Sequence, residues 1–254
     1  MAYFRGDIQS LVLEMETGLT AYLPHDRGRE QKQPYRVVYL LHGLWDNATT
    51  WTRFSNLEYY ASKYNLAVIM PEVQRSFYMD MKNGYDYFRY VSEELPMLCQ
   101  RMFHISDSRE DTFVAGVSMG GYGALKCALA HPERYAAVAA FSAVCDVAEF
   151  VEQARQGIRG KDFKGPFGEA LELEQKDDLF HLATECAQKT VAERPRILMC
   201  CGQSDFLHNH NVRMREHLKA LGYDLTYREW PGEHEWGFFN EALREGIDYF
   251  GQMK

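Results

Sequence analysis

Gly116-Val-Ser-Met-Gly-Gly-Tyr-Gly-Ala-Leu125 is the stretch of this chain that decides the fold. A short β-branched and aromatic run, Thr112–Ala115, comes directly before it, and an alanine-rich run, Ala124–Ala130, reads as a helix after it. A strand, a tight glycine turn and a helix in this order are the setting of a nucleophile elbow, in which a central serine stands at the end of the strand. The stretch therefore predicts Ser118 as a nucleophile.

The two outer glycines of this motif explain why the turn can be sharp. Gly116 and Gly120 carry no side chain that would obstruct it. In such a turn the Met119 N–H points at any oxyanion that forms at Ser118, assisted by the dipole of the following helix. A glycine-rich turn can also simply pack tightly or hold a phosphate. The flanking strand and small-residue helix favour the nucleophile over these alternatives.

Length, composition and charge predict one large domain and exclude several partners. The chain has 254 residues, 46% of them hydrophobic, which is enough for a large core. No linker, charge block or internal repeat divides it, so we expect a single domain over residues 1–254. The net charge of −8 argues against nucleic acid or an anionic membrane as a partner, because both select basic patches. No apolar run is long enough to span a bilayer.

The cysteines and the N-terminus predict a cytoplasmic protein. None of the six cysteines forms a Cys-x-x-Cys pair, and most lie in apolar strand or helix patterns, where free cysteine behaves as a small hydrophobe. This usage favours a reducing compartment over a disulfide scaffold. The first seven residues lack the apolar core of a signal peptide.

Strand-like and helix-like segments alternate along most of the chain. Eight segments read as strands, the first two as an antiparallel pair: Ile8–Glu14, Leu19–Leu23, Arg36–Leu41, Leu66–Met70, Thr112–Val117, Ala137–Phe141, Ile197–Cys201 and Leu225–Glu229. Helical patterns lie between most of them: Leu57–Tyr64, Tyr87–Leu98 with a kink at Pro96, Val212–Leu221 ended by Gly222, and Trp236–Phe250. This alternation predicts an α/β fold with a mostly parallel sheet covered on both faces.

One segment does not fit the alternation. Residues 148–191 are mainly polar and helical, with a glycine-rich part at Gly157–Gly168. We expect this segment to be an insertion that forms a small helical cap over the carboxyl edge of the sheet.

A serine nucleophile needs a base, and the base needs an acid that orients it. In an elbow protein these follow in the order serine, acid, histidine. His234 follows a late strand directly, and the turn at Pro231-Gly232 brings it out of the sheet. Asp205 lies in the turn after the Ile197–Cys201 strand and is the preferred acid. Asp146, one strand earlier, is the rival, and Asp205 could instead be only a helix N-cap.

The loop after the third strand, His42–Ala48, should supply the second oxyanion donor. Gly43 lets the backbone turn toward Ser118, so that the Leu44 N–H would act together with that of Met119. His42 precedes the nucleophile in the chain, and we interpret it as a residue that orients the loop.

Aromatic residues flank the predicted site in the sequence. Trp45, Phe206 and Trp236 are the candidates for an apolar substrate pocket, although aromatic residues are otherwise simply core. His208 and His210 resemble part of a metal site, but no ligand set at the usual spacing completes it. We expect them to lie in a loop without a metal role.

These motifs together resemble the α/β-hydrolase esterases of the esterase D and tributyrin-esterase group, which includes S-formylglutathione hydrolases and acetyl and feruloyl esterases. The matching stretches are Tyr39-Leu-Leu-His-Gly-Leu44, Asp46-Asn47, Arg75-Ser-Phe-Tyr78, Glu94-Leu-Pro96, Gly116–Leu125, Cys201-Gly-Gln-Ser-Asp-Phe-Leu207 with Asn211, and Gly232-Glu-His-Glu-Trp236. The resemblance implies the α/β-hydrolase fold with an eight-stranded sheet, a Ser118–Asp205–His234 triad and an oxyanion hole at Leu44 and Met119.

The resemblance also implies a function. We expect a cofactor-free serine carboxylesterase that acts on a small-molecule ester with a short acyl group. An acetylxylan or feruloyl esterase, an S-formylglutathione hydrolase and a non-catalytic binding protein of the same fold remain alternatives; the last would need a broken triad. Relatives commonly carry a small residue at the position of Trp45. The bulky indole here is expected to narrow the part of the substrate pocket that holds the acyl group. The sequence does not decide between a monomer and a homo-oligomer.

Overall fold

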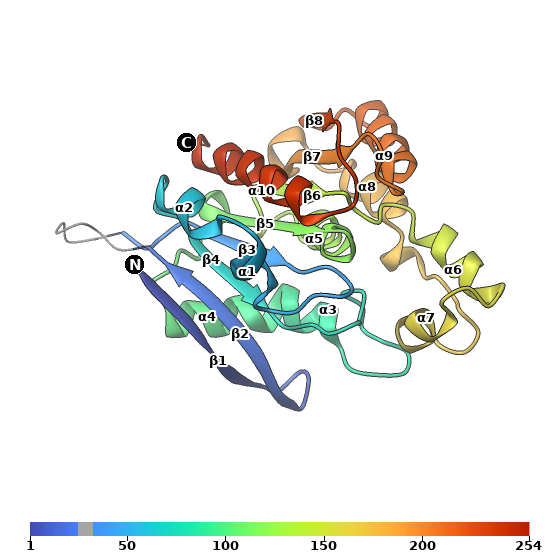
Figure 1. Ribbon diagram of the computed structural model, residues 1–254, viewed down its shortest axis with the longest axis horizontal. Coiled ribbons are helices and arrows are strands. Elements are labelled where there is room, and N and C mark those ends of the chain that lie inside the picture. The colour runs from blue at the N-terminus through green and yellow to red at the C-terminus, as the bar shows by residue number, and fades with distance from the viewer. Residues whose placement is uncertain (25–32, 254) are drawn as a thin grey trace.

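The computed structural model describes residues 1–24 and 33–253, and their strands form one twisted sheet (Figure 1). Its strand order is β1-β2-β4-β3-β5-β6-β7-β8. The strands are β1 (Ala2–Ser10), β2 (Met15–Leu23), β3 (Val37–Leu41), β4 (Ala67–Pro71), β5 (Thr112–Val117), β6 (Ala137–Phe141), β7 (Arg196–Gly202) and β8 (Leu225–Trp230). Neighbours from β4 to β8 are parallel, while β2 pairs antiparallel with both β1 and β4. The predicted mostly parallel sheet is therefore confirmed.

The burial of the central strands explains why their sequences are continuous apolar runs. Every residue of β3, β4, β5 and β6 is buried. A parallel strand covered on both faces has no exposed side, so its sequence does not alternate between apolar and polar residues.

The first strand was predicted in the wrong place. It spans Ala2–Ser10, and the part of Ile8–Glu14 beyond Ser10 is the turn that joins it to β2. Most of β1 is exposed, because it is an edge strand that only β2 covers. Its residues therefore lack the apolar run that revealed the buried strands.

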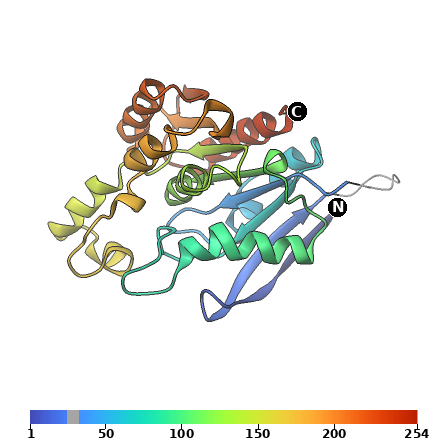
Figure 2. The same cartoon turned by 180° about the vertical axis from the view of Figure 1, so that it is seen from behind.

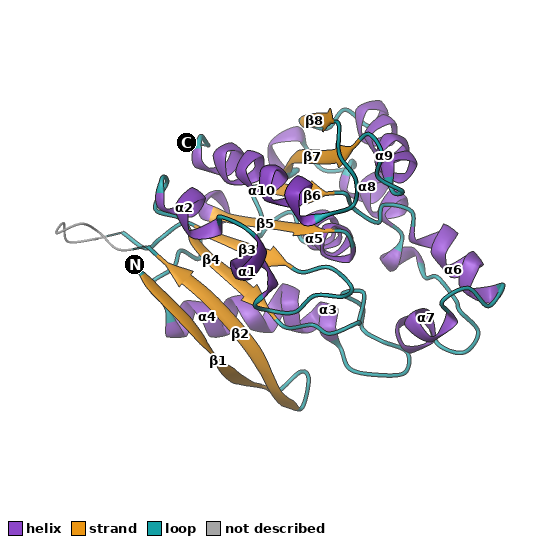
Figure 3. Ribbon diagram, viewed as in Figure 1, coloured by secondary structure: helices purple, strands orange, loops and turns teal. Residues whose placement is uncertain are grey.

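Helices cover both faces of the sheet (Figures 2 and 3). One face carries α1 (Thr50–Phe54), α2 (Leu57–Ser62) and α10 (Trp236–Gly251). The other carries α3 (Tyr87–Arg89), α4 (Leu95–Met102), α5 (Met119–Ala130), α8 (Leu179–Cys186) and α9 (His208–Ala220). The two apolar cores on either side of the sheet keep the carboxyl ends of β5 and β7 in fixed relative positions.

Two helices differ from their predictions in detail. The expected kink near Pro96 is a π-helical turn, Tyr90–Glu94, that separates α3 from α4. The helix predicted to start at Val212 begins at His208, so His208 and His210 lie in its first turn and not in a loop. Gly222 ends this helix as expected, with a φ of 72° that favours glycine.

The segment between β6 and β7 leaves the layered arrangement. It contains α6 (Val147–Arg155) and α7 (Gly160–Phe167), which lie beyond the end of the sheet in Figure 1, and then α8, which returns to pack on α5. The structure therefore places α6 and α7 next to the carboxyl ends of the central strands.

Within residues 1–24 and 33–253, no helix has the length and apolar character needed to cross a membrane. All six cysteines are free and buried.

Candidate active site

The nucleophile elbow is formed as the motif predicts. Ser118 lies between the end of β5 and the start of α5, with φ 56° and ψ −116°. This backbone conformation is strained for a residue with a side chain, and such strain concentrates at functional sites. A Cβ on Gly116 would collide with the carbonyl of Gly120, and one on Gly120 with the carbonyl of Leu41. Only glycine therefore permits the turn to close.

Three side chains from different parts of the chain form a hydrogen-bonded line at this turn. His234 Nε2 lies 3.1 Å from Ser118 Oγ, and His234 Nδ1 lies 2.9 Å from Asp205 Oδ2. His234 comes from the loop after β8 and Asp205 from the turn after β7. Because Nδ1 faces a carboxylate, it carries the ring proton and leaves Nε2 as the acceptor for the serine hydroxyl.

Asp205 is held as an anion at this position. Its exposed fraction is 5%, and its other oxygen, Oδ1, accepts a hydrogen bond from the Leu207 N–H at 2.8 Å. Burial opposes ionisation, but the hydrogen bonds from His234 and Leu207 outweigh it and hold the pKa of Asp205 below its ordinary value.

The rival acid, Asp146, serves a different purpose. Its Oδ1 accepts a hydrogen bond from the Glu149 N–H, which caps α6, and its Oδ2 lies 2.8 Å from Arg213 Nη1. The structure therefore brings Asp205, and not Asp146, to the histidine.

The loop after β3 lies beside Ser118, and hydrogen bonds of His42 and its neighbours hold it in place. The buried His42 ring has Nδ1 2.8 Å from the Gly43 carbonyl, and its Nε2 accepts the Val73 N–H at 3.2 Å. The Tyr78 hydroxyl donates to the His42 carbonyl at 3.0 Å. Within the loop, the Gly43 N–H donates to Asp46 Oδ2. These contacts agree with His42 as a residue that orients the loop.

The two predicted oxyanion donors both line the cavity at Ser118. Met119 begins α5, so its N–H belongs to the first turn, where no intrahelical acceptor exists. The Leu44 carbonyl accepts a hydrogen bond from Arg75 Nη1 at 3.3 Å. This contact holds the peptide group between Leu44 and Trp45, while the peptide group that carries the Leu44 N–H is held through its Gly43 oxygen, 2.8 Å from His42 Nδ1.

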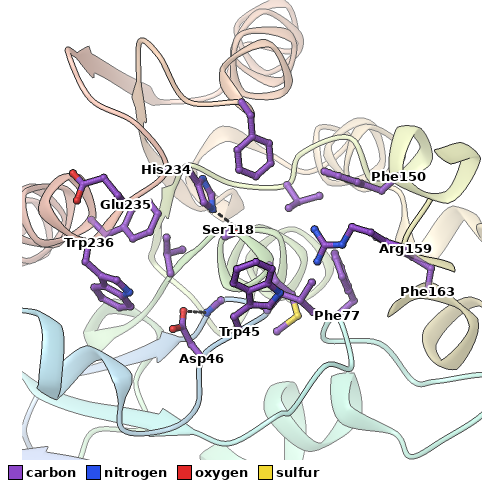
Figure 4. A pocket seen from close by; sticks show the side chains of 17 residues that line it. Trp45, Asp46, Phe77, Ser118, Phe150, Arg159, Phe163, His234, Glu235 and Trp236 are labelled. Carbon is purple, nitrogen blue, oxygen red and sulfur yellow. Dashed lines mark hydrogen bonds between the residues drawn. The ribbon is translucent and has the colours of Figure 1, made fainter. Parts of the chain in front are cut away.

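Ser118 opens into a cavity of about 490 Å³ (Figure 4). This volume is that of a typical small-molecule site. Most of the side chains that line it are apolar or aromatic, and a few are polar. The complete lining is Gly43, Leu44, Trp45, Asp46, Phe77, Val117, Ser118, Met119, Val144, Phe150, Arg159, Phe163, Phe206, His234, Glu235, Trp236 and Phe239.

All three predicted aromatic candidates line this cavity. Trp45 has an exposed fraction of 82%, so it is not packed beneath the loop as structural support. The Phe206 ring lies against His234, with 4.6 Å between the ring centroids. Trp236 stacks on Phe54, with 5.3 Å between the ring centroids.

The segment that contains α6 and α7 forms part of the cavity wall, which the sequence did not predict. Phe150 and Phe163 are stacked with centroids 5.9 Å apart, and Arg159 lies between their helices in the sequence. Phe150 and Phe163 are two of four phenylalanines in the mainly polar segment of residues 148–191, so the sequence alone did not single them out. Nothing in the sequence pattern distinguished Arg159 from the surface arginines around it.

The two histidines at the start of α9 each contact a glutamate side chain. His208 Nε2 lies 3.2 Å from Glu229, and His210 Nε2 lies 3.3 Å from Glu149. Among the residues that the structure describes, no group of three histidine, cysteine or acidic side chains is arranged to hold a metal ion.

Comparisons with known proteins agree with this geometry. The model of the Esterase family, described as "Putative esterase", matches residues 10–250. An acetyl esterase of Caldicellulosiruptor saccharolyticus is 29% identical over 100% of this chain and 99% of its own length.

Two solved structures of Staphylococcus aureus proteins superpose closely. A fluorophosphonate-binding serine hydrolase, described as substrate-bound, has a TM-score of 0.90 and 29% identity, covering 99% of this chain and 98% of its own. An S-formylglutathione hydrolase has a TM-score of 0.85 and 28% identity, covering 99% of each chain. The chain therefore belongs to the Esterase family, and it is a serine hydrolase of the α/β-hydrolase fold with the activity of a carboxylesterase.

Proposed function

We propose that Ser118, His234 and Asp205 are the catalytic triad of this carboxylesterase, and that it hydrolyses short-chain acyl esters through an acyl-enzyme. The observation that carries this proposal is the line of two hydrogen bonds from Ser118 Oγ through the His234 ring to Asp205. Each member then has the neighbour that its chemical role requires.

In the first half of the reaction, Ser118 Oγ attacks the ester carbonyl while His234 Nε2 takes the hydroxyl proton. The carbonyl oxygen becomes an oxyanion that the N–H groups of Met119 and Leu44 stabilise. The tetrahedral intermediate then breaks its bond to the alcohol oxygen, and His234 returns the proton to that oxygen. An alcohol leaves, and the acyl group remains on Ser118.

In the second half, water replaces the alcohol. His234 removes a proton from the water as it attacks the acyl carbonyl, and it then protonates the Ser118 oxygen as the acid leaves. Asp205 stabilises the imidazolium that forms in each half and keeps the ring in the correct tautomer. Its low pKa means that it remains ionised throughout.

We further propose that residues 148–191 act as a cap on the single domain of residues 1–254, and that the cavity wall limits the acyl group to short chains. Phe150 and Phe163 enter the cavity from α6 and α7, opposite the aromatic side chains near α10. Trp45, Phe206 and Trp236 would contact the substrate in this arrangement.

Two relatives keep narrower versions of the activity open, and the sequence resemblance adds a third. The acetyl esterase supports an acetyl substrate, and the S-formylglutathione hydrolase supports a thioester. A tributyrin-esterase activity follows from the sequence resemblance.

Six free, buried cysteines support a cytoplasmic location, and the charge of −8 supports a substrate other than nucleic acid.

A panel of esters on the wild-type protein and Ser118→Ala tests the proposal. The panel runs from p-nitrophenyl acetate to octanoate and adds methyl ferulate, acetylated xylo-oligosaccharides and S-formylglutathione. We expect the fastest turnover on short acyl groups, and a loss on the order of a millionfold in kcat for the variant if the triad acts as a unit. A variant with an unchanged circular dichroism spectrum and a tenth of the activity would remove Ser118 as the nucleophile.

A further inference from the structure

The cavity at Ser118 contains a cation that ester hydrolysis does not require. Within the described part of the chain, Arg159 is the only lysine or arginine in the lining. In Figure 4 its guanidinium points inward, toward Ser118 and Trp45. It lies 5.9 Å from the centre of the Trp45 ring. Its side chain has an exposed fraction of 41%, so an anion bound in the cavity can reach the guanidinium.

The position of Arg159 is built by its neighbours. Arg159 has a left-handed backbone with φ 54°, which residues with a side chain adopt rarely. Its Nε lies 3.0 Å from Asp162 Oδ2, and its carbonyl accepts the Asp162 N–H at 2.9 Å. The guanidinium is therefore held through Nε, and its two terminal nitrogens, Nη1 and Nη2, remain available to bind a ligand.

The carboxylate that pairs with Arg159 is shared with a second arginine. Asp162 has an exposed fraction of 5%, and its other oxygen lies 2.5 Å from Arg75 Nη2. Burial opposes its ionisation, but the two guanidinium groups outweigh this effect and lower the pKa of Asp162. Two cations against one anion leave a net positive charge on this side of the cavity.

The acidic groups of the cavity lie elsewhere and have other partners. Asp46 accepts the Gly43 N–H, and Glu235 caps α10 by accepting the N–H groups of Gly237 and Phe238. In Figure 4 both carboxylates lie on the other side of Ser118 from Arg159. The cavity is therefore electrostatically asymmetric about the nucleophile.

We propose that Arg159 forms an anion subsite, and that the preferred substrates of this esterase are esters that also carry a carboxylate. The inference rests on the proposed function of Ser118, since it assigns the second recognition group of the same substrate. A guanidinium presents a planar fork of donors that matches the two oxygens of a carboxylate. The subsite can serve a carboxylate on either half of the ester, because the cavity surrounds Ser118.

Two matched pairs of esters separate these two halves. Phenyl acetate and 4-acetoxybenzoate differ by a carboxylate on the leaving group, and ethyl butyrate and monoethyl succinate differ by a carboxylate on the acyl group. For each pair, kcat/KM is measured for the wild-type protein, Arg159→Gln, Arg159→Lys and the control Lys161→Gln. The control removes one positive charge from α7 at an exposed residue outside the cavity lining.

We expect Arg159→Gln to lower kcat/KM for the charged member of one pair roughly ten- to a hundredfold relative to the neutral member. Comparing ratios between proteins cancels the intrinsic reactivity of each ester. Arg159→Lys should retain part of the preference, because it keeps the charge and loses the fork. Lys161→Gln should leave both ratios unchanged.

Three results would overturn the subsite. They are unchanged ratios in Arg159→Gln for both pairs, an equal change in Lys161→Gln, and a wild-type protein that discriminates against both charged esters. If the wild-type protein hydrolyses no ester of either kind, the proposed function fails instead.

A measurement without any variant covers the case in which Arg159→Gln does not fold. Benzoate should inhibit wild-type hydrolysis of phenyl acetate more strongly than its neutral analogue benzamide, and added salt should reduce this difference. Equal inhibition by both compounds at low salt would contradict the subsite.

Discussion

Replacing Asp205 with asparagine should lower kcat about ten-thousandfold, and the structure shows why so small a change is so damaging. Asp205 Oδ1 accepts the buried Leu207 N–H, so the amide oxygen of an asparagine must take that position. The amide NH₂ is then forced into the position of Oδ2, facing His234 Nδ1. A donor there requires an unprotonated Nδ1, which moves the ring proton to Nε2, where the Ser118 proton has to be received.

The expected magnitude is that of a wrong tautomer in a comparable triad, about four powers of ten. At about 1.4 kcal/mol per tenfold, this is about 5.5 kcal/mol of lost transition-state stabilisation. The loss should appear in kcat with little change in KM, because Asp205 contacts the histidine and not the substrate.

The assay is steady-state hydrolysis of p-nitrophenyl acetate, with thermal unfolding as the check on folding. Asp146→Asn is the matched control, since asparagine is as good an N-cap as aspartate and Asp146 caps α6 and pairs with Arg213 rather than with His234. It should leave kcat nearly unchanged. A folded Asp205→Asn protein within tenfold of wild type, or a larger loss in Asp146→Asn, would refute the reasoning.

Trp45→Gly should raise the octanoate-to-acetate ratio of kcat/KM about tenfold or more, because the exposed indole lines the cavity; an unchanged ratio in a folded variant would exclude this role. Tyr78→Phe removes the hydroxyl that donates to the His42 carbonyl and should lower kcat up to roughly tenfold while the fold persists, whereas an unaltered kcat would mean that the loop needs no such support. Asp162→Asn should lower Tm at pH 7. The folded pKa of Asp162 is depressed, so its stabilisation is present above the unfolded value of about 3.9 and is lost as the pH falls through the folded value. The Tm difference from wild type should therefore shrink toward pH 3, and a difference that stays constant would assign the effect to packing.

The sequence predicted the parts of the fold that are buried on both sides. β3 to β6 are continuous apolar runs, and their bounds match the structure within a residue. β1 was misplaced because an exposed edge strand has no such run. The start of α9 was missed because His208-Asn-His-Asn211 contains weak helix formers, and contacts with the rest of the fold compensate for them.

The candidate site was predictable where a residue follows directly from its element. Ser118 has its own motif, and His234 and Asp205 each follow a strand that is visible in the sequence. The serine, acid, histidine order admits both Asp205 and Asp146, and the hydrogen bond to His234 gives the physical reason for Asp205. Arg159 could not be found in this way, because its place in the cavity depends on how α6 and α7 pack, and no local pattern encodes that.

The arrangement of the cavity has a consequence for how this enzyme could change over evolutionary time. The hydrogen-bonded serine, histidine and aspartate stand on loops after β5, β8 and β7, whereas part of the cavity wall comes from α6 and α7 in a single segment after β6. Substitutions or exchanges within that segment can reshape the substrate repertoire without disturbing the strained elbow. A chimera that received residues 147–167 from a relative should therefore inherit the donor's selectivity while keeping the host's chemistry.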